Sequence, residues 1–441
     1  MPQKKNKLPA SLLALSVVSG SAMADVTQQV EDALNFYHYG KNGAVKFDLN
    51  TRYENVNQYQ TPAPDVKTAE AVTTRLRIGL LSPVFHGIQG YAEYAGNLAW
   101  HEDYNSGRNN YTAYSKVLDP QLSELNQLWL SYDGIPDTVI KGGRQRIKLD
   151  DDRFIGNVGW RQMEQNYDSV LITHNNQQLF GLTVNAGYIG NVQTFTGTNE
   201  RVNAPLLNVN YKVGDYGNLV GYGYWMDYTD TQDPVVGGFS TVEKSNQTYG
   251  VRMSNYQKPG DSLKLSDNYG LVYTAEWGFQ KNYGHGNTPY QAQRINLMGG
   301  FTAYNFLTFQ GAVEQLDGHG HNKTFDTPLG TNHAFQGWAD VFVVNTPDNG
   351  IRDVFGTVVS TFDRGDIVLT GVYHDYSDDT GQRHYGKEWD FSALKKFGKH
   401  YSLLAKYAYY SADSSYVTGG VDKSFTNTDT QKIWLQGNIS F

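Results

Sequence analysis

The sequence predicts an all-β fold: a transmembrane antiparallel β-barrel of about 18 strands, of the kind that spans bacterial outer membranes. Three observations support this prediction. Apolar and polar residues alternate in many segments up to the last residue, short and long connections alternate along the chain, and the composition is rich in tyrosine and glycine but modest in hydropathy. Alternation with a period of two residues gives each strand one face for lipid and one for water.

The last strand, residues 431–441, shows the pattern most clearly. Its apolar positions Ile433, Leu435, Ile439 and Phe441 alternate with polar residues, and the chain ends on an aromatic residue. Trp434 interrupts the alternation, and we expect it inside the barrel or at a rim. Because a sheet in lipid cannot leave an edge unpaired, the strand should close the barrel against residues 45–54. The aromatic end is the signal that barrel assembly machinery reads.

Residues 1–24 have the layout of a secretory signal peptide. A lysine-containing start precedes an apolar run at 8–20, and Ala22-Met23-Ala24 forms a cleavage site. The alternative, a membrane anchor, needs about 20 apolar residues, which this run lacks. Residues 25–44 are polar and form a predicted periplasmic lead-in, and residues 45–441 form one barrel domain. We therefore expect export to the cell outer membrane.

Between these ends, alternation assigns faces to the strands. In the segment 269–280, Tyr273, Ala275 and Trp277 are predicted to face lipid, while Thr274 and Glu276 face the interior. Short turns are expected at 82–87, 133–137, 175–178, 214–217, 304–306, 363–365 and 398–400. Long loops are expected at 100–124, 148–167, 190–203, 229–245, 282–291, 316–350, 378–385 and 413–430. A barrel of this width leaves an aqueous channel.

The composition excludes several classes of protein. The chain has 441 residues, 32 Tyr, 46 Gly, no Cys and a mean hydropathy of -0.53. Without cysteine there is no disulfide framework and no thiolate metal site. Loss of Lys4, Lys5 and Lys7 with the leader takes the formal charge from -8 to -11. This acidic balance gives no indication of a nucleic-acid partner.

The most specific chemistry lies in residues 141–168, where arginines and aspartates are interleaved. This block resembles the alginate export family of outer-membrane porins. The resemblance extends from Ala33 to Phe441 and rests on Gly143-Arg144-Gln145, Asp152-Arg153-Phe154-Ile155-Gly156-Asn157, Gly159-Trp160-Arg161-Gln162, Tyr167-Asp168, Thr74-Arg75-Leu76-Arg77-Ile78-Gly79, Tyr91-Ala92-Glu93-Tyr94, His333-Ala334-Phe335-Gln336-Gly337-Trp338-Ala339-Asp340, Pro347 and Gly350-Ile351-Arg352-Asp353.

The resemblance implies an 18-stranded porin with a strongly charged pore that passes anionic oligo- or polysaccharide such as alginate. Arginine presents a fork that binds carboxylate with two hydrogen bonds. The predicted pore-lining residues are Lys46, Arg52, Arg75, Arg77, Arg144, Arg146, Arg153, Arg161, Arg252 and Arg294. Arg144 and Arg146 should share a strand face. Together with Arg153 and Arg161 they should lie in or beside the constriction of the pore, fixed partly by Asp150 to Asp152.

Two alternatives stay open. The 141–168 segment could be held inward by its own Arg–Asp pairs without touching solute, and the chain could be a general or small-solute diffusion porin. The inward-facing candidates include more basic than acidic residues, which favours an anionic solute. The basic ones are Lys46, Arg52, Arg75, Arg77, Lys212, Arg252, Arg294, Lys406 and Lys432, and the acidic ones are Asp48, Glu54, Glu93, Glu276, Glu314, Glu388 and Asp390.

No catalytic motif is present, since Ser169 and His174 lack a nucleophile pattern, so we expect no enzyme activity. His319, His321 and His333 lack metal-ligand spacing, and the aspartates near Gly381 lack an EF-hand layout. We therefore expect no cofactor and no metal. The expected partners are outer-membrane lipid and lipopolysaccharide, an anionic saccharide or small solute and the barrel assembly machinery, with no nucleic acid and a monomeric state.

Overall fold

The computed structural model describes residues 43–60, 66–176, 181–229, 242–259, 261–304, 306–343, 346–413 and 428–441. Its strands are β1 (Ala44–Gln60), β2 (Ala69–Leu81), β3 (Ile88–Asp103), β4 (Leu122–Ile135), β5 (Thr138–Gln145), β6 (Asn166–Asn176), β7 (Leu182–Gln193), β8 (Asn199–Lys212), β9 (Asn218–Tyr228), β10 (Asn246–Ser254), β11 (Leu263–Lys264), β12 (Tyr269–Asn282), β13 (Gln291–Ala303), β14 (Leu307–Leu316), β15 (Ile351–Phe362), β16 (Ile367–Ser377), β17 (His384–Phe397), β18 (Tyr401–Ala412) and β19 (Thr428–Ser440).

Four short 3-10 helices complete the described elements: η2 (Gly214–Tyr216), η3 (Val242–Lys244), η4 (Asn332–Ala334) and η5 (Asp363–Gly365). No helix in the described ranges has the length and apolar character needed to cross a bilayer. The predicted leader and nearly all of the lead-in lie outside the described residues, as do most of the loop between β9 and β10 and most of the loop between β18 and β19.

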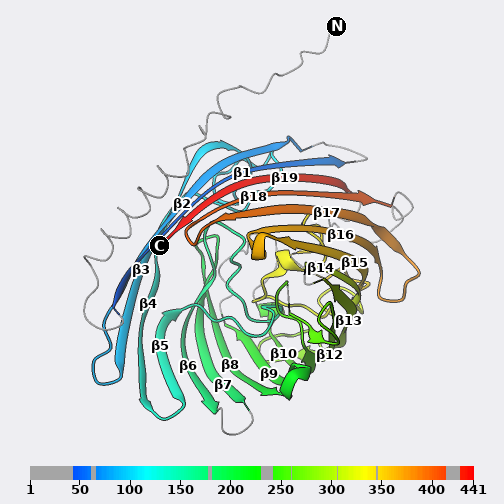
Figure 1. Cartoon of the computed structure of the whole chain (residues 1–441). Coiled ribbons are helices and arrows are strands. Elements are labelled where there is room, and N and C mark those ends of the chain that lie inside the picture. The colour runs from blue at the N-terminus through cyan, green and yellow to red at the C-terminus, as the bar shows by residue number, and fades with distance from the viewer. Residues whose placement is uncertain are drawn as a thin grey trace.

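The sheet is a closed antiparallel barrel of 18 strands, and the two-residue strand β11 pairs only with the start of β12. Every other strand pairs with its neighbours in sequence, and β1 lies beside β19 (Figure 1). The β1–β19 register runs from Asp48 opposite Ser440 to Gln60 opposite Thr428. This confirms the predicted closure. Phe441 adds backbone hydrogen bonds with Phe47 beyond the end of β19.

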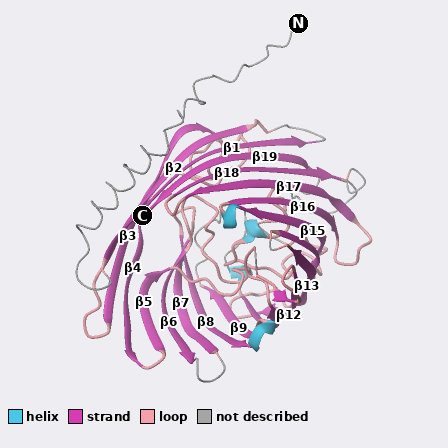
Figure 2. Ribbon diagram, viewed as in Figure 1, coloured by secondary structure: helices cyan, strands magenta, loops and turns pink. Residues whose placement is uncertain are grey.

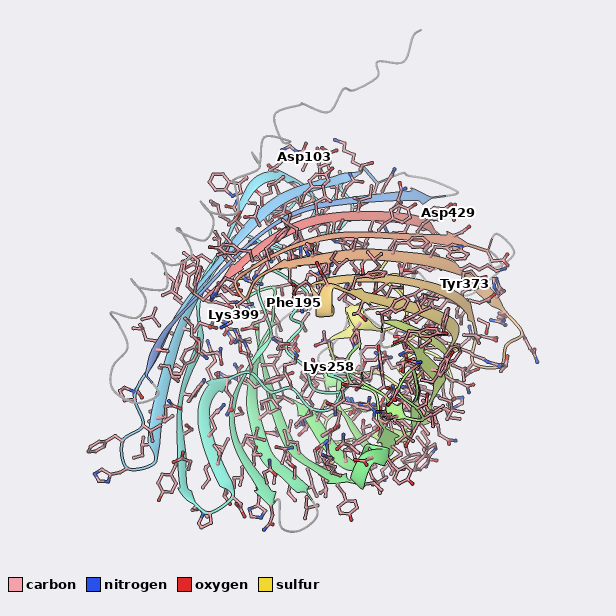
Figure 3. The ribbon with its side chains drawn as sticks, in the orientation of Figure 1. Asp103, Phe195, Lys258, Tyr373, Lys399 and Asp429 are labelled. Atoms are coloured by element: carbon pink, nitrogen blue, oxygen red, sulfur yellow. The ribbon has the colours of Figure 1, made fainter. Side chains whose placement is uncertain are left out.

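The predicted faces of β12 are confirmed. In β12, Ala275 and Trp277 are exposed on the outer face, whereas Thr274 and Glu276 are buried on the inner face. Side chains project from both faces of the wall (Figure 3). Trp434 is fully buried inside the barrel, which resolves the interruption of alternation in β19.

The connections at one end of the barrel are short, and this is called the short-turn end below; the opposite end is the long-loop end. Two predicted connections differ in the structure. The loop expected at 190–203 is only a connection from 194 to 198, because β7 and β8 continue with a bulge and pair as far as Gln193 and Asn199. Conversely, the connection 255–268 at the short-turn end is long and contains β11.

Two long connections, 146–165 and 317–350 (described apart from residues 344 and 345), fold into the barrel, where loops and short helices are visible in Figure 2. Their apolar residues pack with inward-facing wall residues into a core of aromatic and aliphatic side chains, which includes Phe154, Tyr222, Phe325, Phe342 and Trp434. The expectation of an unfilled interior is therefore revised: part of the interior is a packed core. The reason is that these loops carry enough apolar residues to be stable away from water.

Candidate functional site

The two inner loops are joined to each other along their backbones. Gly156 donates its N–H to the carbonyl of Leu329 (2.9 Å), and Thr331 donates its N–H to the carbonyl of Asp152 (2.8 Å). A Cβ on Gly156 would lie 2.3 Å from the Thr331 hydroxyl oxygen, so only glycine permits this approach. The two loops consequently form a single layer inside the barrel.

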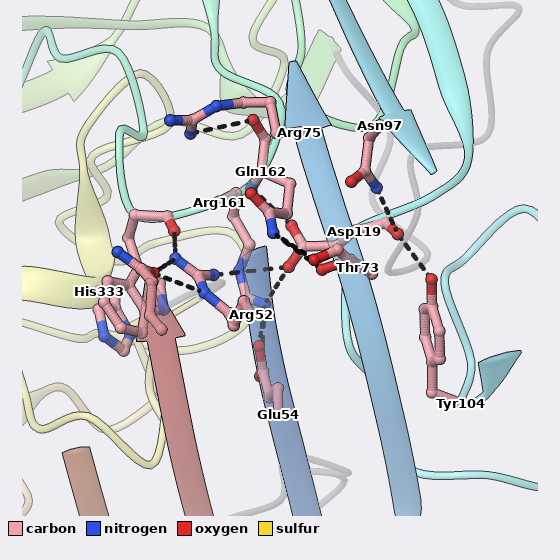
Figure 4. A network of polar contacts seen from close by, with 12 residues as sticks. Arg52, Glu54, Thr73, Arg75, Asn97, Tyr104, Asp119, Arg161, Gln162 and His333 are labelled. Atoms are coloured by element: carbon pink, nitrogen blue, oxygen red, sulfur yellow. Dashed lines mark hydrogen bonds and ion pairs between the residues drawn. The ribbon is translucent and has the colours of Figure 1, made fainter. Parts of the chain in front are cut away.

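Arg161 connects this layer to the wall. Its guanidinium lies 3.3 Å from the Glu54 carboxylate on β1, 3.6 Å from Asp119 in the β3–β4 loop and 3.3 Å from Asp340 in the 317–350 loop. Asp119 is completely buried and also accepts a hydrogen bond from the backbone N–H of Gln162 (Figure 4). Burial disfavours the charged guanidinium, but these three carboxylates outweigh it and hold the pKa of Arg161 above its ordinary value.

Four more of the predicted arginines surround Arg161, and we call this group, with its carboxylate partners, the Arg161 cluster. Arg52 packs against the Trp160 ring at 4.2 Å and lies 3.5 Å from Asp119. Arg75 pairs with Asp48 and donates to the carbonyl of Gln162. Arg77 and Arg146 both contact Glu164, at 3.5 and 2.5 Å, and Arg146 also contacts Glu93 at 2.8 Å.

Cations and carboxylates of the Arg161 cluster differ in their exposure to solvent. The Arg146 side chain is 32% exposed, while its partners Glu93 and Glu164 are 6% and 1% exposed. Arg77 is 12% exposed. Arg161 is 10% exposed, against 2% for Glu54 and none for Asp119. In these pairs the carboxylates lie behind the guanidinium groups, which form the part that meets water. The other two arginines of the cluster differ, because Arg52 is only 3% exposed and Arg75 is 9% exposed against 28% for its partner Asp48.

Three further predicted arginines form the Arg153 cluster on a different part of the wall. Arg153 is buried and donates to Glu314 (3.0 Å) on β14 and to Gln336 (3.0 Å) in the 317–350 loop. Arg294 joins Glu314 and Glu276, each at 2.7 Å, and Arg252 contacts Asp151 at 3.2 Å. Burial lowers the pKa of Arg153 despite Glu314. Arg153, which has almost no exposed surface, ties the loop layer to β14, and Arg294 contacts the layer through the Phe154 ring at 5.4 Å.

A lysine and a histidine also anchor the layer, next to the Arg161 cluster. Lys406 on β18 lies 3.7 Å from the Trp338 ring centroid, 4.2 Å from that of Trp160, and 2.7 Å from the His333 Nε2. The ammonium has no acceptor, so the Nε2 must accept, and the Nδ1–H donates to Asp340 (2.6 Å). Burial keeps the pKa of His333 well below its ordinary value. The imidazole is therefore neutral.

Asp340 is the meeting point of these contacts. It accepts hydrogen bonds from His333, Arg161 and Lys432, the last at 2.7 Å. Burial disfavours its charge, but His333, Lys432 and Arg161 outweigh this and hold the pKa of Asp340 well below its usual range.

Arg144 does not join Arg146. It lies opposite Leu128 on β4 and Asp168 on β6, and Leu128 is exposed on the outer face. Its guanidinium pairs with Asp168 at 2.7 Å. The prediction that both arginines share one strand face is wrong, because β5 ends at Gln145 and Arg146 turns inward beyond the strand. Lys46 also lies apart, at the short-turn end, with its Nζ 5.3 Å from the Tyr91 ring centroid.

The predicted partners within the 148–167 segment also differ. Asp150 hydrogen-bonds Asn208, Asp151 contacts Arg252 and Asp152 contacts Lys148, so none of the three holds Arg161. Asp151 does accept a hydrogen bond from the backbone N–H of Arg153 at 3.3 Å. Sequence analysis missed Asp119, Glu164 and Asp340 as partners. No local pattern distinguishes these three from other loop carboxylates, since each also binds a partner far away along the chain, such as Arg161 for Asp340 and Arg77 for Glu164. Within the described residues, no group of three or more His, Asp or Glu side chains is arranged to hold a metal ion.

The closed barrel places the chain in the fold class of outer-membrane porins. Three solved structures illustrate the similarity. OpdK of Pseudomonas aeruginosa, solved with vanillate, is 11% identical, with a TM-score of 0.63, over 90% of this chain and 98% of OpdK. A BenF-like porin of Pseudomonas fluorescens Pf-5 is 13% identical (TM-score 0.65; 91% and 99% of the two chains), and OccAB4 of Acinetobacter baumannii is 15% identical (TM-score 0.63; 92% and 99%).

No family model matches the chain, and no curated protein matches it. The resemblance to the alginate export family consequently has no support from a family model. What the comparisons show is the barrel fold of porins.

Proposed function

We propose that this chain forms an outer-membrane channel for passive passage of small anionic solutes, carboxylates in particular. The observation that carries the proposal is the exposure difference in the Arg161 cluster: Arg77, Arg146 and Arg161 meet solvent while their carboxylate partners are buried. Fixed guanidinium groups in a confined aqueous passage raise the local concentration of anions. Similarity to a BenF-like porin and to OpdK solved with vanillate supports a small-solute porin.

A small solute fits better than alginate or another anionic polysaccharide. The 146–165 and 317–350 loops cross the interior as one layer, and buried ion pairs and backbone hydrogen bonds join them to each other and to the wall. A polymer would need that layer to move aside along its whole path, whereas a small carboxylate needs only a passage beside it. In the outer membrane, short turns face the periplasm and long loops face outward, so the Arg161 cluster would lie between the two entrances.

The experiment is ion selectivity of the full-length folded barrel in planar bilayers. Reversal potentials under a KCl gradient should show anion preference, stronger at low salt because charges are less screened there. Replacing both Arg77 and Arg146 with glutamine should lower that preference and weaken block by a small carboxylate such as benzoate. Arg144→Gln is the matched control: its guanidinium lies on the outer face, so selectivity should not change.

Cation preference in the native channel, unchanged by the double substitution, would contradict anion passage. Stronger block by oligouronate than by benzoate, lost in the double variant, would favour the polysaccharide hypothesis instead. Steady conductance steps are themselves required, because a barrel without an open passage gives none.

A further inference from the structure

Two lysines at the short-turn end flank a pair of aromatic rings. Lys46 belongs to β1 and Lys141 to β5, while Tyr91 and Trp129 come from β3 and β4 between them. The Lys46 Nζ lies 5.3 Å from the Tyr91 ring centroid, the Lys141 Nζ lies 4.4 Å from the Trp129 ring centroid, and the two centroids are 5.4 Å apart. We call these four side chains the Lys46–Lys141 patch.

The strand register places the patch on the inner face. Leu128 and Leu130 are exposed on the outer face, so Trp129 between them faces inward. Tyr91 lies directly opposite Trp129, and Lys141 lies opposite Ser131, the next inward position on β4. Lys46 lies opposite Gly79, two positions nearer the short-turn end than Arg77 on β2. The patch therefore follows the Arg161 cluster along the wall.

Gly79 makes the patch possible. A Cβ at this position would lie 2.1 Å from the Tyr91 hydroxyl oxygen, so the phenol ring crosses β2 only because Gly79 has no side chain. The Tyr91 hydroxyl donates to Glu93 at 2.5 Å, which fixes the ring. Tyr91 thus reaches from β3 to Lys46 on β1, and the arrangement is built into the wall.

The two ammonium groups lack carboxylate partners among the described residues, in contrast to Arg77 and Arg146. Contact with an aromatic face orients a cation but does not neutralise it. A solute with one carboxylate would compensate only one of the lysines. A solute with two carboxylates could compensate both while its carbon chain lies against the rings.

We infer that the Lys46–Lys141 patch is a binding site for small dicarboxylates on the short-turn side of the Arg161 cluster. The inference rests on the proposed function, since it assigns a solute class to the same anion channel. It places a second binding step between the Arg161 cluster and the short-turn exit.

The test compares glutarate with valerate, a monocarboxylate with the same number of carbons, as blockers of the full-length channel. Added from the short-turn side, glutarate should bind more tightly than valerate. Lys46→Gln and Lys141→Gln should each raise the dissociation constant of glutarate about tenfold, as expected for one charge-assisted hydrogen bond. The effect on valerate should be smaller, because one lysine remains. Gly79→Val, which displaces the Tyr91 ring, should also weaken glutarate binding.

Lys395→Gln is the control, since Lys395 lies at the same end of the barrel but shares the outer face of β17 with Trp389 and pairs with Asp363. Unchanged glutarate binding in the Lys46→Gln and Lys141→Gln double variant would overturn the inference, as would equal losses for glutarate and valerate. If anion preference persists in the same recordings, the proposed function stands and only this site fails. Cation preference in the native channel would overturn the proposed function itself.

Discussion

Replacing Asp340 with asparagine should release the 317–350 loop from the wall while leaving the barrel folded. Asparagine keeps the size of the side chain and tolerates the left-handed backbone at this position, where φ is +58°. It removes the negative charge shared by Arg161, Lys432 and His333. Arg161 keeps Glu54 and Asp119, whereas Lys432 keeps, among the described residues, only the Trp434 ring at 5.9 Å.

The size of the effect follows from burial. Asp340 is 7% exposed, and removing one partner from a buried ion pair costs about 3–5 kcal/mol. The backbone ladders of the barrel do not depend on this residue, so the cost should appear as local opening of the loop. A cost of about 3 kcal/mol corresponds to more than about 100-fold in the opening equilibrium.

Hydrogen exchange measures this directly. Amides of residues 331–343 should exchange about 100-fold faster in Asp340→Asn, and single-channel current should become noisier, while the heat-modifiable folded form persists. Asp348→Asn is the matched control in the same loop, because Asp348 is partly exposed, lies 3.7 Å from His321, and such pairs contribute about 1 kcal/mol or less. Unchanged exchange at 331–343 would refute the anchoring role of Asp340.

Three further predictions concern the end of the chain, a wall face and a loop carboxyl. Phe441 stacks on His400 at 4.3 Å, so Phe441→Asp should lower the yield of heat-modifiable barrel in the outer membrane, whereas Phe441→Trp should not; equal yields would contradict this. Ala275→Arg on the outer face should cost about 2–4 kcal/mol of folding free energy in lipid, whereas Ala275→Leu should cost little, as urea titration in vesicles can measure. Burial raises the pKa of Asp150 to about 6, so the folded chain binds a proton at this residue at a higher pH than the unfolded chain. The free energy of unfolding should therefore increase as the pH falls from about 7 to about 4. Asp150→Asn should abolish this gain in urea titrations at pH 7 and pH 5, and an unchanged pH dependence would show that another group titrates.

The wall of the barrel was predictable from the sequence because the alternation within each strand defines the two faces of that strand. Alternation in β12 gives the faces of Ala275 and Glu276 without knowledge of any other strand, and pairing of β19 with β1 follows from the need to leave no edge. At the end of a strand, where the alternation of apolar and polar residues stops, the predicted direction of the side chains was wrong. Arg144 and Arg146 are two residues apart, yet they lie on different sides of the wall, because β5 ends between them.

The interior was predictable only as a set of residue types. Arg153 and Arg161 were expected to matter, but their partners Glu314, Glu54 and Asp340 lie far away in the sequence. The choice among many loop carboxylates depends on the folded position of two long loops, and no local pattern encodes it. For the same reason the packed core around Phe154 and Phe325 could not be foreseen.

The pairing of β1 with β19 also determines when the barrel can close during folding. The register joins residues near the two ends of the described sequence. The barrel therefore cannot close until β19 has reached the assembling sheet. Until then, β1 and the most recently added strand both present open edges, which invite pairing with other chains. Bringing such distant segments together is slow, since contacts between remote residues must overcome the entropy of a long intervening loop. We therefore expect that a chain shortened by one strand does not close into a slightly smaller barrel. It remains an open sheet with two unpaired, aggregation-prone edges.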